Sequence, residues 1–505
     1  MNKKIIDINQ VEDIVLNVRH KGNKVVHCHG VFDLLHIGHI KYFEEAKSMG
    51  DVLIATITPD KFVNKGPGRP AFNENLRAEA LSALSTIDFV IINSFPTAEE
   101  IISIIKPDFY VKGPDYKNFE NDITGKIIDE KIAVETIGGE IAFTSGAIFS
   151  SSNLINNFVY NKNEEQKRYI ADLKKSFSYD DITNYIENLS EKKVLVIGEI
   201  IIDEYVLCNS VGKSGKEPVL VNQKISSEKY AGGSIAVANH LSKFCNQITI
   251  MSYIGDRDSH EDFIKSRTLE NVNLDTIIKS NSPTILKTRH IDNYTKTKVS
   301  AIYDINDTDL NEQEEQIFYE KLKNNIEDYD LVIVVDYGHG LVTQKIARYI
   351  EQKSKFLSIN TQLNSFNRGY HTISKYKKAD YVCVHSGELR YDSRNRFEPI
   401  ETLMKELSRK MQSKSINITL GKDGAISLQN DQFLKCPAFA DKILDRVGAG
   451  DTVLAITSLC QASQIPNSLG LLIGNLAAAE KVSHTGTGFI LDKTNLLKAI
   501  NTLLK

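Results

Sequence analysis

Two histidines three residues apart, His36 and His39, combine a side-chain type and a spacing that favour binding chemistry. They flank Gly38 and precede residues 40–49, which have the pattern of a helix. The first turn of a helix leaves backbone N–H groups unpaired and carries partial positive charge, so phosphates bind there. Glycine admits a ligand close to the backbone, and each imidazole can add a hydrogen-bond donor. The pattern therefore predicts a site for phosphate groups.

Two other interpretations of these histidines remain open. A His-x-x-His pair can hold a metal ion, but Ile37 and Gly38 fill the intervening positions, so the glutamate of an H-E-x-x-H site is absent. Isolated histidines are also often core or surface residues without a ligand. The missing glutamate favours anion binding over metal binding.

Basic residues follow a second predicted strand, residues 52–57. A lysine and an arginine lie in a loop rich in glycine and proline, Lys65-Gly66-Pro67-Gly68-Arg69-Pro70. Such a pair can bind a triphosphate, although a solvated surface loop is the alternative. Arg77 lies on the predicted helix 74–84, where by itself it would pass for an exposed charge.

A third candidate site lies far downstream, where Gly448, Ala449 and Gly450 precede Asp451. Glycines that open a helix make a cradle of N–H groups for a transferring phosphate, and an adjacent aspartate can accept a hydroxyl proton. A glycine turn at an ordinary helix start is the alternative.

Strand and helix patterns alternate in the part of the chain that carries the two histidines and the basic residues. From residue 24 to about 156, short β-branched runs alternate with amphipathic stretches, which predicts a parallel sheet covered by helices. Such sheets bind ligands at the carboxyl ends of their strands, and the motifs fall there. The predicted elements are residues 25–26, 40–49, 52–58, 74–84, 89–92, 98–105 and 109–112.

The composition changes after residue 156. Residues 157–192 are polar, rich in Asn, Lys and Glu, and have a helical pattern, so they are expected to form a helical linker. Residues 194–203 then begin a second β-rich region. We predict an α/β protein of two domains, residues 1–156 and 193–505.

The overall composition is that of an ordinary globular protein. The 505 residues include 61 basic and 65 acidic side chains, which favours small-molecule partners over nucleic acid. Six widely spaced cysteines without a C-x-x-C pair indicate a reducing compartment rather than a disulfide framework. The sequence has no signal-peptide pattern and no apolar run of membrane-spanning length, so we expect a cytoplasmic protein.

The first domain resembles the nucleotidyltransferase superfamily through G-V-F-D-L-L-H-I-G-H at residues 30–39. This form of its H-x-G-H signature occurs in cytidylyltransferases and in heptose-phosphate adenylyltransferases. The resemblance implies a Rossmann-like parallel sheet and assigns catalytic roles to His36, His39, Lys65 and Arg77. The nucleotide-binding residues that it implies are Gly30, Phe32, Asp33, Gly38, Lys112, Gly113, Asp115, Ser150, Ser151 and Ser152. The serines could instead only cap a helix.

The second domain resembles ribokinase-type (PfkB) sugar kinases through the G-A-G-D motif at residues 448–451. This resemblance implies a ribokinase-like α/β fold with a small β lid. Asp451 would be the catalytic base and Gly448, Ala449 and Gly450 the anion hole. Sugar would bind at Asp203, Gly232, Gly233, Lys287 and Arg289, and ATP at Glu388, Thr419, Gly421, Lys422 and Asn475.

Three positions depart from the kinase pattern. Ala236 replaces the asparagine of the G-G-A-A-N-V-A motif, His339 stands where heptose kinases usually have lysine, and His385 replaces the asparagine of N-x-x-E. In the first domain, residues 121–144 are longer than in the adenylyltransferases. The departures in the kinase motifs predict a changed sugar pocket, and the longer segment of the first domain predicts a different acceptor or base specificity.

Together the two halves resemble the bifunctional heptose-7-phosphate kinase/heptose-1-phosphate adenylyltransferase family with the domain order reversed. The resemblance implies an enzyme of nucleotide-activated sugar synthesis that uses ATP, a nucleotidyl donor (ATP or CTP) and Mg²⁺, which is held through phosphates and a candidate ligand, Glu388. The expected assembly is a homodimer. Two alternatives remain: a CTP-dependent transferase for a glycerol- or polyol-type phosphate fused to its kinase, and a transferase regulated by a degenerate kinase-like sensor.

Overall fold

A computed structural model describes residues 4–63, 65–66, 69–116, 126–145, 162–486 and 488–504. The chain divides into two compact units, which we name unit 1 (Met1–Asn163 and Leu497–Lys505) and unit 2 (Glu164–Leu496). In the described part of the chain, no helix has both the length and the apolar character needed to cross a bilayer.

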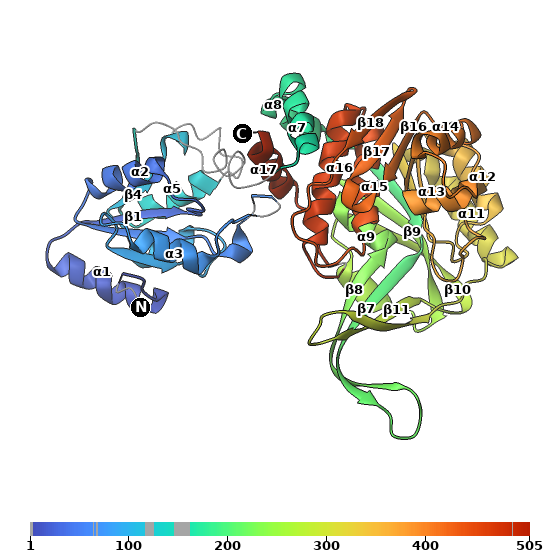
Figure 1. Ribbon diagram of the computed structural model, residues 1–505, viewed down its shortest axis with the longest axis horizontal. Helices are drawn as coiled ribbons and strands as arrows, with labels where there is room; N and C mark the ends of the chain where they lie inside the picture. Colours follow the sequence, from blue (N-terminus) through green and yellow to red (C-terminus); the bar gives the residue numbers. More distant parts are fainter. Residues whose placement is uncertain are drawn as a thin grey trace. The chain divides into compact units, whose positions relative to one another are not determined.

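Unit 1 is built on a parallel five-stranded sheet with the strand order β3-β2-β1-β4-β5. Its strands are β1 (Val25–Gly30), β2 (Val52–Ile57), β3 (Phe89–Ile92), β4 (Phe109–Lys112) and β5 (Glu140–Phe143). Its helices include α1 (Val11–His20), α2 (Ile37–Lys47), α3 (Glu74–Ser82), α4 (Glu99–Ile105) and α5 (Lys126–Thr136) (Figure 1).

Both faces of this sheet are covered. Successive side chains of a strand point to opposite faces, and on each face they pack into a hydrophobic cluster. On β2, Leu53 and Ala55 pack with Phe43 of α2 on one face. Ile54 packs on the opposite face with Val15 of α1 and Ile102 of α4. The predicted Rossmann-like parallel sheet is confirmed.

The boundaries of unit 1 differ from the prediction at the two elements that hold the histidines. Strand β1 continues through His29 and Gly30, and α2 begins at Ile37, directly after His36. Helix α5 and strand β5 lie within the segment that the sequence marked only as long, because their apolar patterns are short and interrupted by charges.

Unit 2 contains a nine-stranded sheet with the order β10-β9-β6-β13-β14-β15-β16-β17-β18. The first seven strands in this order are parallel, and β17 runs antiparallel to β16 and β18. The strands are β6 (Lys193–Gly198), β9 (Gln247–Arg257), β10 (Val272–Pro283), β13 (Leu331–Asp336), β14 (Leu357–Thr361), β15 (Tyr381–His385), β16 (Ser415–Thr419), β17 (Ala425–Gln429) and β18 (Gln432–Cys436).

Helices cover both faces of this sheet (Figure 1). One face carries α9 (Ser234–Leu241), α15 (Ala449–Ala462) and α16 (Asn467–Val482). The other carries α11 (Glu312–Asn325), α12 (Gln344–Lys353), α13 (Ser386–Ser393) and α14 (Ile400–Lys410). Strand β13, in the middle of the sheet, is buried along its whole length, as is typical of a doubly covered parallel sheet.

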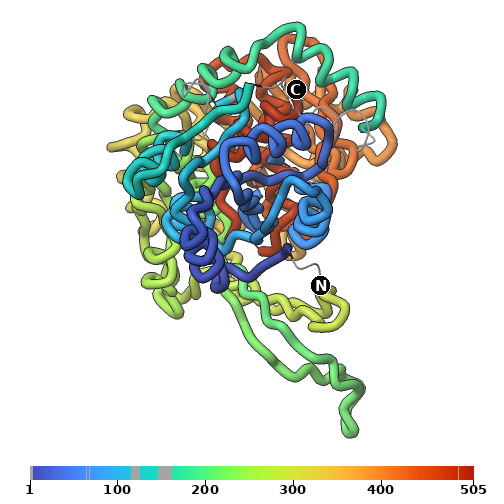
Figure 2. Tube along the Cα trace, turned by 90° about the vertical axis from the view of Figure 1, so that its left-hand side faces the viewer, coloured from blue at the N-terminus to red at the C-terminus, as the bar shows by residue number. Residues whose placement is uncertain are grey.

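A second, four-stranded sheet has the order β12-β11-β7-β8 and corresponds to the predicted β lid. It consists of β7 (Ile200–Lys213), β8 (Leu220–Gly233), β11 (Ile285–Asp292) and β12 (Lys298–Asp304). Strands β7 and β8 form a long hairpin that projects from unit 2, as Figure 2 also shows from the side.

Helices α7 (Glu164–Ser176) and α8 (Tyr179–Glu187) form where the sequence predicted a helical linker. They belong to unit 2. The hydroxyl of Tyr169 donates to the carbonyl of Ser468 at 2.6 Å, and the amide of Gln166 donates to the carbonyl of Ala438 at 2.6 Å. These contacts attach α7 to the kinase-like fold.

Candidate active sites

The first candidate site of unit 1 is the start of α2, where His36 is the N-cap residue. The Nδ1 atom of His36 accepts a hydrogen bond from the backbone N–H of Gly38 at 3.0 Å. The rings of His36 and His39 lie 4.0 Å apart between centroids. The local sequence thus places both imidazoles at the helix terminus that follows the carboxyl end of β1.

The pKa of His39 is lowered to about 3, mainly by burial and also by the nearby His36 and Lys65. Burial also lowers the pKa of His36. Both imidazoles are therefore uncharged at neutral pH and act as hydrogen-bond donors rather than as fixed charges. An arriving anion would raise both pKa values by favouring the protonated form.

The aspartate of the motif, Asp33, organises the basic loop. Its carboxylate accepts backbone N–H groups of Ala71 at 2.7 Å and Phe72 at 3.1 Å, and Arg69 lies 3.5 Å from it. Asp33 is 5% exposed and is bound to this loop, and its predicted contact with a nucleotide stays a prediction.

Arg77 is 1% exposed, and its guanidinium makes hydrogen bonds and an ion pair within the protein. It donates to the carbonyls of Val31, Phe72 and Thr58 and pairs with Asp60 at 2.6 Å. These bonds tie the segments after β1 and β2 to α3. The predicted contact of Arg77 with a triphosphate therefore lacks support from this placement, since its donors point at backbone and carboxylate oxygens.

Phe32 and Gly30 are coupled through packing. Phe32 adopts a positive φ of 48°, and its buried ring lies 5.0 Å from that of Phe43 and 5.7 Å from that of His39. A Cβ atom at Gly30 would lie 3.0 Å from this ring. The two residues predicted to bind nucleotide thus shape the turn that carries the histidines.

Lys112 ends β4 and forms a buried ion pair with Glu130 of α5 at 2.7 Å. Its ammonium also lies 5.2 Å from the ring centroids of Tyr110 and Tyr116. Among the described residues other than its chain neighbours, no atom lies within 4 Å of a Cβ built at Gly113. Asp115 belongs to a short 3-10 helix, Pro114–Tyr116, while Ser150, Ser151 and Ser152 lie outside the described residues.

A cluster of imidazole and hydroxyl groups at the end of β1 was not predicted from the sequence. Nδ1 of His29 lies 2.7 Å from the hydroxyl of Thr56, and its Nε2 lies 3.2 Å from that of Thr58. His27 contacts Thr56 at 2.8 Å. The signal was the His-x-His spacing, because alternate residues of a strand share one face.

The candidate site of unit 2 centres on Asp451 in the first turn of α15. The hydroxyl of Tyr337 donates to its Oδ1 atom at 3.1 Å. Burial raises the pKa of Asp451 to about 6, and nearby Asp203 adds to the rise, whereas Tyr337, Lys287 and Lys481 oppose it. A carboxylate with a pKa near 6 is largely ionised at pH 7 and can accept a proton.

The helix start beside Asp451 is open to a ligand. Gly448 is the N-cap residue of α15 with a φ of 82°, a conformation that favours glycine. Among the described residues, and apart from the chain neighbours and the backbone of α15 itself, no atom lies within 4 Å of a Cβ built at Gly450. Ala449 lies between the two glycines, and its backbone N–H donates to the carbonyl of Arg446 at 3.3 Å. The cradle of backbone N–H groups at this helix start stays a prediction.

The β lid contributes a buried ion pair. Asp203 of β7 pairs with Arg289 of β11, and the parallel register sets Asp203 beside Lys287. A Cβ atom at Gly232 would lie 2.6 Å from Oδ2 of Asp203, and one at Gly233 would lie 2.3 Å from the carbonyl oxygen of Glu199. The glycine pair is therefore required sterically by the aspartate and by β7.

The predicted ATP-binding residues differ in burial and in their hydrogen bonds. Glu388 of α13 accepts the N–H groups of Leu363 at 3.2 Å and His385 at 2.7 Å, and burial raises its pKa to about 7. Lys422 is exposed in the 3-10 helix Gly421–Asp423, which follows Thr419 at the end of β16.

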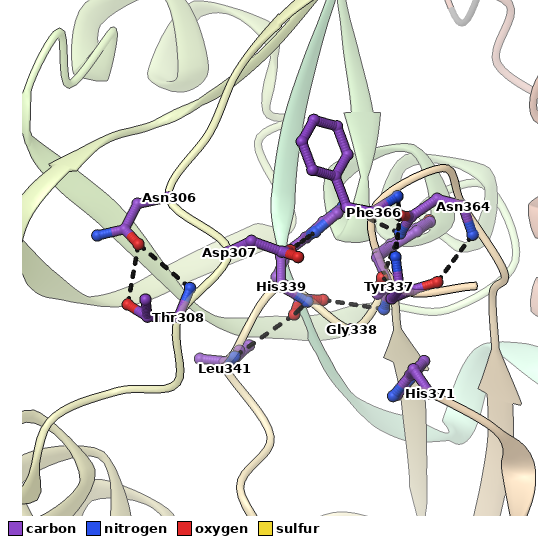
Figure 3. A network of polar contacts seen from close by, with 12 residues as sticks. Asn306, Asp307, Thr308, Tyr337, Gly338, His339, Leu341, Asn364, Phe366 and His371 are labelled. Carbon is purple, nitrogen blue, oxygen red and sulfur yellow. Dashed lines mark hydrogen bonds and ion pairs between the residues drawn. The ribbon is translucent and has the colours of Figure 1, made fainter. Parts of the chain in front are cut away.

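Asn475 donates one N–H of its side-chain amide to the carbonyl of Leu471 within α16 at 2.9 Å, and its predicted role in binding ATP stays a prediction. Of the three departures from the kinase motifs, Ala236 and His339 are buried, at 4% and 0% exposed. Figure 3 shows His339 on the loop after β13, close to Asp307.

Two groups near Asp451 escaped the sequence argument. Tyr337 belongs to the D-Y-G-H-G segment, where only the histidine drew attention. Asp445 accepts the hydroxyl of Tyr205 at 2.7 Å and the ammonium of Lys298 at 3.0 Å. The sequence feature that could have pointed to Asp445 is its position six residues before Asp451.

The fold and the Asp451 site define a kinase-type α/β protein of the sugar kinase class. Residues 191–494, more than half of the chain, match the family model described as pfkB family carbohydrate kinase. The chain belongs to this family. Residues 27–170 match the model described as Cytidylyltransferase-like. The resemblances to both families are confirmed.

Curated relatives carry the name Bifunctional protein HldE. The protein from Aliarcobacter butzleri (strain RM4018) is 39% identical over 142 residues, which cover 28% of this chain and 29% of that protein. The protein from Campylobacter jejuni (strain RM1221) is 28% identical over 308 residues, which cover 60% of this chain and 64% of that protein. The chain thus spans less than two thirds of the length of either relative.

Among solved structures, phosphofructokinase-2 from Escherichia coli in complex with potassium is similar in fold. It aligns with a TM-score of 0.52 at 14% identity and covers 62% of this chain and 100% of that chain. At this identity the similarity concerns the fold alone. The predicted ribokinase-like α/β class of the second half is confirmed.

Proposed function

We propose that the chain is a bifunctional enzyme of nucleotide-activated sugar synthesis. Residues 193–505 phosphorylate a sugar or sugar phosphate, heptose-like in class, from ATP. Residues 1–156 transfer a nucleotidyl group to a sugar 1-phosphate and release pyrophosphate. The two family matches and the names of the relatives support this proposal. The observation that carries it is Asp451, set at the open start of α15 and opposite the lid residues.

In the kinase reaction, Asp451 accepts the proton of the attacking sugar hydroxyl. The hydroxyl oxygen bonds to the γ-phosphorus of ATP while the bond from this phosphorus to the β–γ bridging oxygen breaks, and ADP leaves. The backbone N–H groups of Gly448, Ala449 and Gly450 stabilise the charge on the transferring phosphate. Asp203, oriented by Arg289, accepts a hydroxyl of the sugar.

In the nucleotidyl transfer, an oxygen of the sugar phosphate attacks the α-phosphorus of the nucleoside triphosphate, and pyrophosphate leaves. This displacement needs positioning and charge stabilisation rather than a covalent intermediate. His36 and His39 donate to the phosphates, and Lys65, which lowers the pKa of His39 through its charge, supplies the cation.

We propose Mg²⁺ as the metal of both reactions. Within the described residues, no group of three or more His, Cys, Asp and Glu side chains could hold a metal ion. Mg²⁺ commonly uses one or two carboxylates together with substrate phosphates and water. Glu388 is the candidate carboxylate, although two backbone N–H groups occupy it as placed.

The test is a screen of the full chain with C5 to C7 sugars and their phosphates, supplied with ATP, CTP or GTP. Product mass identifies the phosphorylated sugar and the nucleotide sugar, and pyrophosphate release reports the second reaction. Release with CTP and none with ATP would support the cytidylyl alternative. Transferase activity without any sugar-dependent consumption of ATP would support the regulatory alternative. The side chains of Tyr337, Asp203 and Lys287 near Asp451 argue against that alternative.

We also propose a homodimer in a reducing, cytoplasmic compartment. All six cysteines are free and buried. The β7–β8 hairpin exposes apolar side chains, with Val211 67% and Leu220 55% exposed, and a second copy of the lid is the proposed partner. Light scattering should give a dimer mass that Val211→Lys with Leu220→Lys reduces to a monomer mass.

A further inference from the structure

A buried histidine, His240, connects three segments of unit 2, one of which carries Asp451. It lies in the last turn of α9, which packs against α15 (Figure 1). His240 is 2% exposed, and both of its ring nitrogens have a partner. Nε2 lies 3.1 Å from the hydroxyl oxygen of Thr452, and Nδ1 lies 3.3 Å from the backbone nitrogen of Leu491. Thr452 directly follows Asp451 in α15, and Leu491 belongs to the segment after α16.

The direction of each hydrogen bond in this group is fixed by its two ends. The backbone N–H of Leu491 can only donate, so Nδ1 of His240 accepts and Nε2 carries the proton of the neutral ring. The carbonyl of Gly448 can only accept, so the hydroxyl of Thr452 donates to it at 2.9 Å and accepts from Nε2. Both ends require the Nε2–H tautomer, and the bonds run in one direction from Leu491 to Gly448.

The imidazole of His240 is uncharged near neutral pH. Its pKa is lowered to about 3, mainly by burial and also by the charge of Lys481. A neutral ring has one donor and one acceptor, and both are used here. His240 is therefore a fixed hydrogen-bond donor to Thr452.

The chain of bonds ends on the helix turn that carries the proposed catalytic base. Gly448 is the N-cap residue of α15, and its carbonyl accepts both the hydroxyl and the backbone N–H of Thr452, at 2.9 and 3.0 Å. The carbonyl of an N-cap residue accepts the first hydrogen bond of its helix. Bonds to this carbonyl therefore set the direction of the first turn, which includes Gly450 and Asp451.

The same helix has an equivalent pair of bonds further along. The hydroxyl of Thr457 donates to the carbonyl of Val453 at 2.6 Å and accepts from the hydroxyl of Tyr381 at 2.8 Å. Thr452 and Thr457 are both buried, and each hydroxyl links α15 to another element of unit 2. A purely structural role would be common to both threonines, whereas only Thr452 can act on the first turn.

We propose that His240 is a positioning residue of the kinase site. Through Thr452 it holds the first turn of α15 in the arrangement that receives the transferring phosphate and presents the carboxylate of Asp451. His240 is buried, so it acts through Thr452 and not by contact with the phosphate. This inference rests on the proposed kinase function and adds to it a residue outside the G-A-G-D motif.

The first test measures kcat and KM of sugar phosphorylation in the full chain with His240→Leu, which removes both hydrogen bonds of the ring. The kcat should fall about 3- to 10-fold, as the loss of one neutral hydrogen bond predicts, while the KM values for ATP and sugar change less than about twofold. His240→Gln keeps a neutral donor and a neutral acceptor and should restore kcat to within about twofold. A parent-like kcat in His240→Leu, a loss confined to KM, or an unrestored kcat in His240→Gln would overturn the inference.

Thr452→Val and Thr457→Val are a matched pair, because each removes a hydroxyl with the same two kinds of bond from the same helix. Both should lower the unfolding midpoint in denaturant, but only Thr452→Val should lower kcat, by a factor close to that of His240→Leu. The double variant at His240 and Thr452 should lose no more kcat than the single variants, because both act on one carbonyl. Equal losses of kcat at Thr452 and Thr457 would show a merely structural effect.

The pH profile gives a further readout. The loss in His240→Leu should be the same factor at every pH from 5 to 9, because the ring is uncharged over this range. The acid limb, which Asp451 sets, should stay in place. A loss confined to one limb would contradict a fixed neutral donor.

Two NMR readouts do not depend on the turnover of any sugar. The ring ¹⁵N resonances of His240 should show the Nε2–H tautomer, and the Nδ1–H tautomer would overturn the inference. In a chain labelled with ¹⁵N-glycine, His240→Leu should move the amide signals of Gly448 and Gly450, and Thr457→Val should leave them in place. Unmoved signals in His240→Leu would refute the positioning role.

The two sets of readouts separate this inference from the proposed function. A parent chain that phosphorylates no sugar would reject the proposed function, while the tautomer and the glycine signals would still decide whether His240 holds the first turn of α15. Sugar phosphorylation with an unchanged kcat in His240→Leu would keep the proposed function and overturn the role of His240.

Discussion

The hydroxyl of Tyr337 should set the pH dependence of the kinase reaction. Tyr337→Phe removes the hydrogen bond that this hydroxyl donates to Asp451 at 3.1 Å. That bond favours the ionised carboxylate, so its loss raises the pKa of Asp451 above its value of about 6. The base works only when ionised, so the acid limb of the profile moves to higher pH.

The size of this shift follows from the strength of such a bond. A hydrogen bond to a charged group contributes about 1.5–3 kcal/mol, and one pKa unit corresponds to about 1.4 kcal/mol. At the lower end the pKa rises by about one unit, to roughly 7. The ionised fraction at pH 6 then falls about fivefold, while at pH 8.5 it is nearly unchanged.

The assay is kcat/KM for the sugar acceptor between pH 5 and pH 9. Tyr381→Phe is the matched control, since this buried tyrosine donates to Thr457 at 2.8 Å and does not contact Asp451. The control should keep the acid limb of the parent chain. An unmoved acid limb in Tyr337→Phe, or a loss of equal size at every pH, would refute the electrostatic reasoning.

Three further outcomes follow from the two sites. Asp451→Asn should lower kcat of the kinase reaction by about 10²–10⁴-fold, as loss of a general base predicts, and leave pyrophosphate release intact; equal loss of both activities would contradict separate sites. His39→Asn should do the converse, lowering pyrophosphate release at least about 10²-fold while sugar phosphorylation persists. Gly232→Ala places a Cβ atom 2.6 Å from Asp203, so overpacking should cost about 1–3 kcal/mol in unfolding free energy, measured by denaturant titration. An unchanged unfolding midpoint would show that the lid yields at this point.

The chemistry-bearing motifs could be located from the sequence because each depends on short-range structure. Gly38 and Gly448 each lie at the start of a helix that the sequence pattern predicts, and strand–helix alternation gave the parallel sheet of unit 1. Helix starts and strand periodicity are set by neighbouring residues, so they can be read locally.

Arg77 shows what local reasoning leaves open. By itself it would pass for an exposed helix charge, and its contact with phosphate is what the family resemblance implies. It is 1% exposed, and its partners Phe72, Thr58 and Val31 lie 5, 19 and 46 positions away. A guanidinium binds whichever acceptors surround it, and the packing of the loops after β1 and β2 supplies them all. Lys112 is similar, because Glu130 comes from a helix that the sequence pattern did not predict.

By itself, then, the sequence determined the fold class, the two helix starts and the carboxylate Asp451, since these follow from local patterns. Tertiary structure alone decided which groups act on each other. Lys287 and His339 are separated by 52 positions, and His339 and Asp307 by 32, yet the register of β11 and the loop after β13 bring them into one chain of contacts. Charge and protonation depend on burial and on neighbours, and only packing specifies these.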